Sequence, residues 1–231
     1  MKLTRLLGVG AIALALVSTS IAVEPPQIAQ AGSCTGWTSR VYPPKTIRVY
    51  NNRTGRIKQV GFKTYVLKVM ASGEWPSYLP LESLKVGAVA VKQYAWYYML
   101  KGHHRSWYKT RSGKCYDVQA NTTDALFHPY VQWTPKQLKA VEATWGLSLR
   151  KRGRFFLTGW RAWGSDCGKP VDGWRLYEGG VTKCAKKGWS YLKIQDLYYG
   201  KNFTRVWAPG SEPDRRITMR PANKAYQYIP H

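Results

Sequence analysis

The stretch YVLKVMASGEWPSYLPLESLKVGAVAVKQYAWYY, residues 65–98, decides the fold predicted for this chain. In its second half, apolar and small residues recur at alternating spacings of three and four, the repeat of one face of an α-helix. Pro76 and Pro80 separate this long helix from a shorter one that begins near Tyr65, because proline and the residue before it disfavour helical geometry. The small residues of the long helix would let another element approach closely. Lys92 is expected to face away from its apolar stripe.

The remaining predicted elements are two β-hairpins and two shorter helices, assigned to residues 47–60, 147–157, 134–146 and 190–200. Turn residues between alternating apolar positions indicate the hairpins, and a capping hydroxyl before each short helix indicates its start. Residues 105–130 and 159–183 lack a clear period and are expected to be irregular. The predicted fold class is α+β, a single domain in which a few helices pack on short antiparallel β-hairpins.

The two ends of the chain differ in composition from this domain. Residues 1–31 have basic residues, an apolar run and a final Ala-Gln-Ala, which is typical of a secretory signal peptide cleaved before Gly32. A retained membrane anchor is the alternative, although the apolar run is short for a membrane span. The domain is assigned to residues 32–208, and the basic, proline-containing residues 209–231 are expected to form a flexible tail. A secreted protein, extracellular or associated with the cell wall, is therefore expected.

The chain is strongly basic, with 36 Lys and Arg against 12 Asp and Glu and a formal net charge of +24. Such a charge attracts polyanions, which outside a bacterial membrane include anionic wall polymers, wall carboxylates and lipid headgroups. The alternative is that these charges only keep the protein in solution. No nucleic-acid-binding motif is present, so no specific nucleic-acid partner is expected.

Four cysteines are far apart in the sequence, at Cys34, Cys115, Cys167 and Cys184. In an oxidising compartment an even number of cysteines indicates disulfides, and four permit three connectivities. We favour Cys34 with Cys115 and Cys167 with Cys184, the latter because both lie in one loop-rich segment. A zinc site is the alternative.

Three stretches, in order, resemble the SpoIID/LytB family. They are residues 65–76 leading into 80–95, residues 140–146, and residues 188–191 with Ile194, Tyr198 and Tyr199. Enzymes of the sporulation branch of that family are lytic transglycosylases, which cut the glycan of peptidoglycan, and the glutamate of the first stretch is their catalytic acid. The resemblance therefore implies that Glu74 is the catalytic residue.

Glu74 also suits this role on physical grounds. Glycosidic cleavage needs a protonated carboxyl group near neutral pH, and an apolar neighbourhood disfavours the charged form of a glutamate. A transglycosylase can work with one such group, which protonates the leaving oxygen and then accepts the proton of the sugar's own 6-hydroxyl. A hydrolase would need a second carboxylate, for which the candidates are Asp117, Asp124 and Glu178, each expected mainly to form hydrogen bonds in a loop. The alternative for Glu74 is stabilisation as an anion at a helix start.

Further residues are expected to bind the substrate. Trp75, Trp160 and Trp163 are placed near a groove, because aromatic faces pack on sugars, and Tyr94 is expected to face Glu74. Two positions depart from the family pattern. Lys92, where the family usually has arginine, is either on a solvated helix face or in contact with a substrate carboxylate. Glu178 lies in the segment where the family tends to have a glutamine.

The family's metal cluster is not expected here. Gln119, Asp124 and Ala125 stand where its His and Cys ligands would fall, so neither a metal nor another cofactor is predicted. The sequence thus favours an exported lytic transglycosylase acting on peptidoglycan. The alternative is a non-catalytic wall-binding protein of the amidase-enhancer kind, whose partner would be another wall hydrolase.

Overall fold

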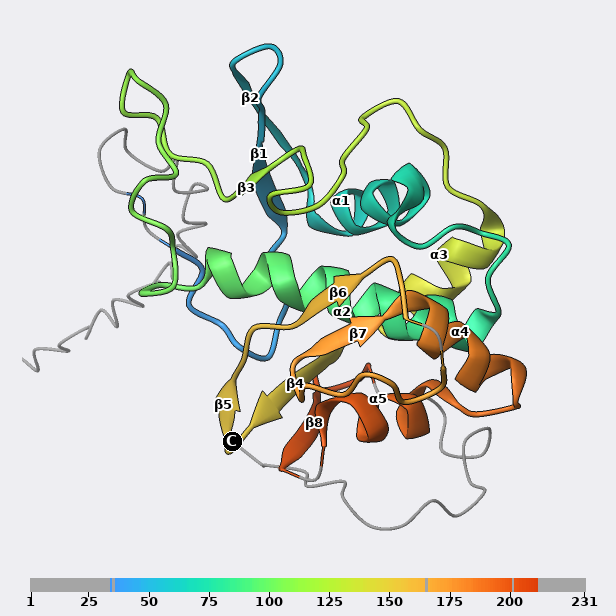
Figure 1. Ribbon diagram of the computed structural model, residues 1–231. Helices are drawn as coiled ribbons and strands as arrows, with labels where there is room; N and C mark the ends of the chain where they lie inside the picture. The colour runs from blue at the N-terminus through green and yellow to red at the C-terminus, as the bar shows by residue number, and fades with distance from the viewer. Residues whose placement is uncertain (1–33, 35, 165, 201, 212–231) are drawn as a thin grey trace, which may run out of the picture. The chain divides into compact units, whose positions relative to one another are not determined.

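The structure is a computed structural model that describes residues 34, 36–164, 166–200 and 202–211. The predicted signal peptide and the predicted tail beyond Ser211 lie outside these residues. The described part contains five α-helices, one π-helical turn and three small sheets, so the predicted α+β class is confirmed (Figure 1). No described helix is both long enough and apolar enough to cross a membrane.

The first sheet contains the predicted N-terminal hairpin. Strands β1 (Thr46–Asn51) and β2 (Arg56–Gly61) pair antiparallel, and β3 (Val118–Gln119) pairs parallel with the other edge of β1. Helix α1 (Phe62–Val69) follows β2 directly and begins three residues before the expected start. It continues into a π-helical turn, η1 (Met70–Glu74), which ends before Pro76 as predicted.

Helix α2 (Leu81–Met99) lies at the centre of the packing. It contacts the four other α-helices and strands β4 and β6, and Figure 1 shows it running between α1 on one side and β6 and β7 on the other. A helix surrounded in this way is apolar on most of its circumference. The prediction that this helix has one apolar stripe was therefore too narrow. Lys92, which was expected to face away from that stripe, lies in the core with an exposed fraction of 1%.

The second sheet contains the second predicted hairpin. Helix α3 (Pro135–Glu142) starts with the expected capping box between Thr134 and Gln137. Strand β4 (Leu147–Lys151) then pairs antiparallel with β5 (Arg154–Phe155) and, along its other edge, with β8 (Phe203–Trp207).

Residues 159–183 are more regular than the sequence predicted. Strands β6 (Gly159–Arg161) and β7 (Arg175–Tyr177) form a parallel pair, and α4 (Glu178–Lys186) follows at once. Strands of three residues are too short to show an alternating pattern, so the expectation of an irregular segment was wrong there. Helix α5 (Tyr191–Tyr199), capped by Ser190, ends the helical part.

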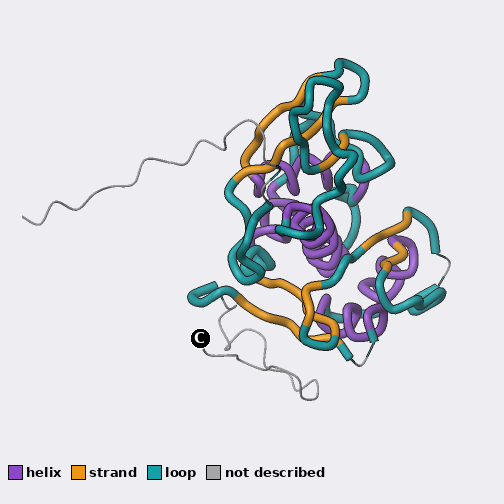
Figure 2. The backbone as a smooth tube through the Cα atoms, turned by 90° about the vertical axis from the view of Figure 1, so that its left-hand side faces the viewer, coloured by secondary structure: helices purple, strands orange, loops and turns teal. Residues whose placement is uncertain are grey.

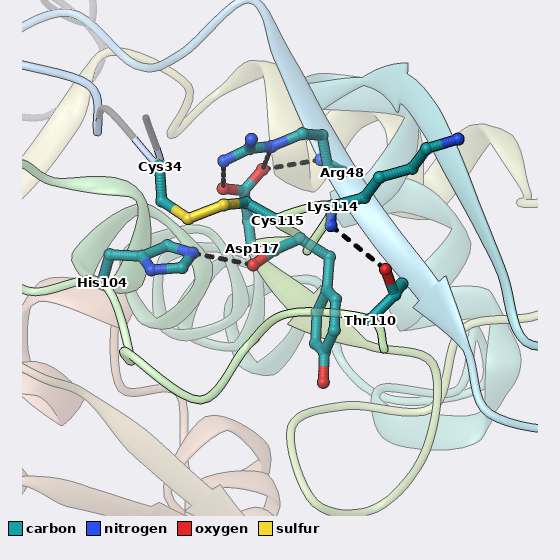
Figure 3. Close-up of a disulfide and its surroundings, with 8 residues drawn as sticks. Cys34, Arg48, His104, Thr110, Lys114, Cys115 and Asp117 are labelled. Atoms are coloured by element: carbon teal, nitrogen blue, oxygen red, sulfur yellow. Dashed lines mark hydrogen bonds and ion pairs between the residues drawn. A yellow bond between two sulfur atoms is a disulfide. The ribbon is translucent and has the colours of Figure 1, made fainter. Parts of the chain in front are cut away.

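Two disulfides join Cys34 to Cys115 and Cys167 to Cys184, the connectivity favoured from the sequence. The first connects the segment before β1 to the long segment between α2 and α3. Figure 2 shows how much of the chain consists of loops and turns, drawn in teal. Close to this bridge, the Asp117 carboxylate accepts hydrogen bonds from the backbone and guanidinium of Arg48, the shortest at 2.6 Å (Figure 3). Disulfides are consistent with an extracytoplasmic location.

Candidate functional site

Glu74 stands at the end of η1, where the chain turns sharply. Gly73 adopts a φ of 108°, a conformation that side chains other than hydrogen rarely permit, and the helical path ends there. The turn lets Glu74 leave the axis of α1 and reach two segments that are remote in sequence. A glycine directly before Glu74 therefore allows the backbone turn that places the Glu74 side chain in the site.

Both oxygens of the Glu74 carboxylate are held by N–H donors. The backbone N–H of Leu126 donates to Oε1 at 2.8 Å, and the indole Nε1 of Trp160 donates to Oε2 at 2.7 Å. These two hydrogen bonds fix the orientation of the carboxylate. The prediction that Glu74 sits in apolar surroundings therefore missed the polar contacts that position it.

Glu74 opens into a pocket of about 330 Å³. The lining combines aromatic rings, hydroxyl groups and two guanidinium groups. It consists of Glu74, Tyr94, Tyr98, Thr122, Thr123, Asp124, Leu157, Gly159, Trp160, Arg161, Ala162, Trp174 and Arg175. Of the predicted site residues, the structure thus brings Glu74, Tyr94 and Trp160 together around one cavity, with the rings of Tyr94 and Trp160 edge to face at 5.5 Å.

A buried carboxylate organises the loop on one side of the pocket. The Asp124 side chain accepts hydrogen bonds from the Tyr94 hydroxyl at 2.9 Å, the Tyr108 hydroxyl at 2.8 Å and the Gln119 backbone N–H at 2.7 Å. It also forms a salt bridge with Arg105 at 2.7 Å. Burial, followed by the charge of Asp124, raises the pKa of Tyr94 well above its ordinary value, so its hydroxyl stays a donor. This network holds the loop whose Leu126 N–H binds Glu74.

Trp75 does not belong to the pocket, so the expectation that it lies near a groove was wrong. Its ring is fully buried and packs against Gly87 of α2, and its carbonyl accepts a hydrogen bond from Gln137. Trp163 is on the surface with 74% of its area exposed and does not line the pocket. Trp174 supplies an aromatic ring to the pocket instead. The sequence analysis did not single it out, because the pairing of β7 with β6 could not be predicted.

The expectation of a solvated helix face for Lys92 was wrong, since its side chain is buried. Lys92 does not line the pocket, so its contact with a substrate carboxylate stays a prediction. Its ammonium group donates to the backbone carbonyls of Thr144 and Trp145, the latter at 2.5 Å. These carbonyls follow the end of α3, where helix carbonyls lack partners within the helix. Burial, with a further effect of Lys63, lowers the pKa of Lys92 well below its ordinary value.

A substitution of Lys92 tests this structural role. Lys92→Met keeps the length of the side chain but leaves both carbonyls without their donor, which should lower the free energy of unfolding by about 1–2 kcal/mol. Denaturant unfolding measures this loss. Binding of wall glycan by the folded variant should be unchanged, whereas a substrate-contacting lysine would show weaker binding at unchanged stability.

Glu178 is the first residue of α4 and is half-buried. Burial, followed by repulsion from the charge of Glu74, raises the pKa of Glu178 to about 7. It does not line the pocket, so direct contact with a substrate stays a prediction. The other two candidates for a second carboxylate, Asp117 and Asp124, are both held in loop hydrogen bonds and salt bridges.

The described residues contain no group of three or more His, Cys, Asp or Glu side chains arranged to hold a metal ion. At the positions of the family's metal cluster, the Gln119 side chain binds Asn52 and Asn121, and Asp124 holds the network described above. Both side chains thus have protein partners.

The fold and the pocket define an α+β domain with a carboxylate-centred cavity lined by aromatic and polar side chains. Residues 50–150 match the family model SpoIID, described as stage II sporulation protein. This segment is therefore a SpoIID family domain, of a family linked to sporulation and cell-wall remodelling. It includes Glu74, Tyr94 and Asp124, whereas β6, β7 and α4 lie beyond the matched residues. A search of curated proteins found no match.

Proposed function

We propose that this protein is an exported lytic transglycosylase that cleaves the glycan strands of peptidoglycan, with Glu74 at the reacting centre. The observation that carries the proposal is the Glu74 carboxylate itself. It is oriented by Leu126 and Trp160 and opens into a cavity lined by aromatic rings. A glycan-cleaving site requires such a fixed carboxyl group beside surfaces that pack on sugar rings.

The chemistry needs one proton to be delivered and one to be taken up. The bond between the anomeric carbon and the bridging oxygen breaks as that oxygen receives a proton from the carboxyl group. The 6-hydroxyl oxygen of the same sugar attacks the anomeric carbon, and its proton passes to the carboxylate. The product is a 1,6-anhydro sugar end, formed without water, and the carboxyl group is protonated again.

The charges at the pocket support a peptidoglycan substrate. Peptidoglycan carries carboxylates on its peptide stems and, where a stem is absent, on its muramic acid. Arg161 and Arg175 contribute guanidinium groups to the cavity. Arg175 is paired with Asp172, while the exposed Arg161 makes, among the described residues, one long hydrogen bond, of 3.5 Å, to the Trp160 carbonyl. Arg161 is therefore available to a substrate carboxylate. The net charge of +24 would add attraction to the anionic wall.

Digestion of purified peptidoglycan tests the proposal. Wild-type protein is incubated with glycan that carries or lacks its peptide stems, and the fragments are analysed by mass spectrometry. We expect fragments with anhydro ends, each lighter than the hydrolysed fragment by one water. Glu142→Gln, a change of an exposed residue far along α3, serves as the active control, and heat-denatured protein as the inactive one.

Two other outcomes would overturn the proposal. Fragments with reducing ends would identify a hydrolase. Sedimentation of the protein with the wall, without release of any fragment, would identify the wall-binding amidase enhancer, which should then accelerate an added amidase.

A further inference from the structure

A second cavity, of about 620 Å³, adjoins the pocket that contains Glu74. Tyr98 and Leu157 line both cavities, so the two meet at these side chains. The remaining lining comes from the end of α2 and from residues 102–107, the loop that follows it. A long ligand can therefore extend from Glu74 into the second cavity.

A row of aromatic rings connects Glu74 to this second cavity. The Trp160 ring, which binds Glu74, lies 5.5 Å from the Tyr94 ring, measured between ring centroids. The Tyr94 ring lies 5.2 Å from that of Tyr98, which in turn lies 5.4 Å from that of Tyr97. Tyr97 and Tyr98 follow Tyr94 by three and four residues, a spacing that places side chains on the same face of a helix. Half-buried rings are thus continuous between the two cavities.

Trp107 gives the second cavity an exposed aromatic face, with 71% of its area open to solvent. A large aromatic side chain that is exposed in a cavity wall is typical of a binding site, because a ligand can cover its apolar face. The residue after it anchors the loop. Tyr108 is buried, and its hydroxyl donates to the Asp124 carboxylate at 2.8 Å. The loop therefore presents the Trp107 ring from a braced position.

Asp124 also connects the two cavities. Its side chain lines the first cavity and forms the 2.7 Å salt bridge with Arg105 of the second. Two residues further along the chain, the Leu126 N–H holds the Glu74 carboxylate at 2.8 Å. One buried side chain thus braces both the loop that contacts Glu74 and the loop that carries Trp107, which fixes the two cavities relative to each other.

Arg105, the guanidinium group in the lining of the second cavity, is already engaged. Besides its salt bridge with the buried Asp124, it stacks on the Tyr98 ring at 3.8 Å. In the first cavity, by contrast, Arg161 forms no salt bridge with the described residues. A substrate carboxylate is therefore attracted to the first cavity rather than to the second.

The two histidines of the second cavity also have protein partners. His104 donates from Nε2 to the Tyr116 carbonyl at 2.8 Å. The His103 ring packs on the Tyr97 ring at 4.2 Å. Burial, followed by the charge of Arg40, lowers the pKa of His103, so its ring is neutral near neutral pH. The residues that line this cavity thus offer aromatic rings and no unpaired guanidinium or ammonium group, which suits an uncharged sugar better than an anionic peptide stem.

We propose that the second cavity is a subsite for a further sugar of the glycan strand, and that the Trp107 ring stacks on this sugar. The inference deepens the proposed function and rests on it, because that function supplies the glycan in the first cavity. A strand held in both cavities has its position along the groove fixed, so one glycosidic bond is aligned with Glu74. The peptide stems, which carry carboxylates, are left to Arg161 and to solvent.

Indole N–H signals in an NMR titration report each cavity separately, without any need for cleavage. The full chain is labelled with ¹⁵N at tryptophan and titrated with chitohexaose, an uncharged N-acetylglucosamine hexamer that has the glycan linkage of peptidoglycan. The signals of Trp160 and Trp107 are assigned by their loss in Trp160→Phe and Trp107→Phe. Both should shift with one common dissociation constant. Trp163, which lines neither cavity, should not shift.

Truncation of Trp107 gives the second readout. Trp107→Ala should weaken chitohexaose binding, followed at the Trp160 signal, by roughly tenfold, because the stacking face is lost. Trp107→Phe keeps an aromatic ring and should retain most of the affinity. Tyr130→Ala is the matched control, since this side chain is 87% exposed and lines neither cavity, and it should bind as the wild type does.

Three results would overturn the inference. The first is a Trp107 signal that does not move with chitohexaose. The second is a pair of different dissociation constants at Trp107 and Trp160, which would indicate two independent sites instead of one strand. The third is a soluble stem peptide that shifts the Trp107 signal and displaces the hexamer, which would identify a peptide site.

The two proposals fail in different ways. If the wild type cleaves peptidoglycan and the Trp107 signal ignores chitohexaose, the second subsite is disproved and the transglycosylase stands. If the wild type releases no fragment, the transglycosylase is disproved, and a joint shift of Trp160 and Trp107 still establishes that one strand lies in both cavities.

Discussion

Glu74→Gln is expected to slow glycan cleavage by about 1000-fold, in the range that general acid–base catalysis contributes to enzyme rates. Glutamine keeps the size of the side chain but can neither give nor accept the transferred proton. The measurement is the initial rate of anhydro-end formation by purified protein on peptidoglycan. A variant that retains more than about a tenth of the wild-type rate would remove Glu74 from the reaction.

The environment of Glu74 makes a control necessary. Its two oxygens accept from Leu126 and Trp160, whereas a glutamine amide has one oxygen and an NH₂ group that would face one of those donors. Part of the loss of activity would then come from a misplaced side chain at position 74. Trp160→Phe removes one donor and keeps the carboxyl group, so it should cost roughly tenfold. Near-ultraviolet circular dichroism of both variants establishes that the folded packing is retained.

Gly87→Ala is expected to lower the free energy of unfolding by about 3 kcal/mol, at the upper end of the range for overpacking a core. A Cβ on Gly87 would overlap the indole ring of Trp75, and the ring has no free space because it is fully buried. Helix α2 cannot shift away, since other elements contact it on several sides. The gain in helix propensity from glycine to alanine, about 1 kcal/mol, opposes only part of this loss.

Thermal or denaturant unfolding measures the effect, which corresponds to a fall in Tm of roughly 6–12 °C for a domain of this size. Gly61→Ala is the matched control, because its added Cβ would lie 3.5 Å from the nearest atom, Thr64 Oγ1, an ordinary contact. It should stay within about 0.5 kcal/mol of the wild type. Adding Trp75→Leu to Gly87→Ala should recover part of the stability, and failure to do so would locate the strain elsewhere.

Local signals made several parts of this fold predictable. Alternating residues and turns identified both antiparallel hairpins, and the capping box of Thr134 and Gln137 correctly predicted where α3 begins. The small residues of α2 correctly indicated a close approach, which is that of Trp75 at Gly87. These features depend on neighbours in sequence, so a single sequence is enough to find them.

Other parts depend on partners far away in the chain. Lys92 has the polarity of a surface residue, and only the placement of the carbonyls after α3 explains its burial. The parallel pairing of β6 with β7, which brings Trp160 and Trp174 to the pocket, has no local pattern because each strand has three residues. Glu74 was singled out by its motif and its neighbours, while the donors that orient it come from segments more than 50 residues later.

The Cys34–Cys115 bridge has a consequence for the order in which the site forms. It closes a loop with a sequence separation of 81 residues, and such a cross-link lowers the conformational entropy of the unfolded chain by the equivalent of roughly 4 kcal/mol. Cys115 belongs to the same run of chain as Asp124 and Leu126, the residues that brace and contact Glu74. Formation of this disulfide and folding of the loop that binds Glu74 are thus thermodynamically coupled. Under reducing conditions, the contacts between this loop and Glu74 form less readily.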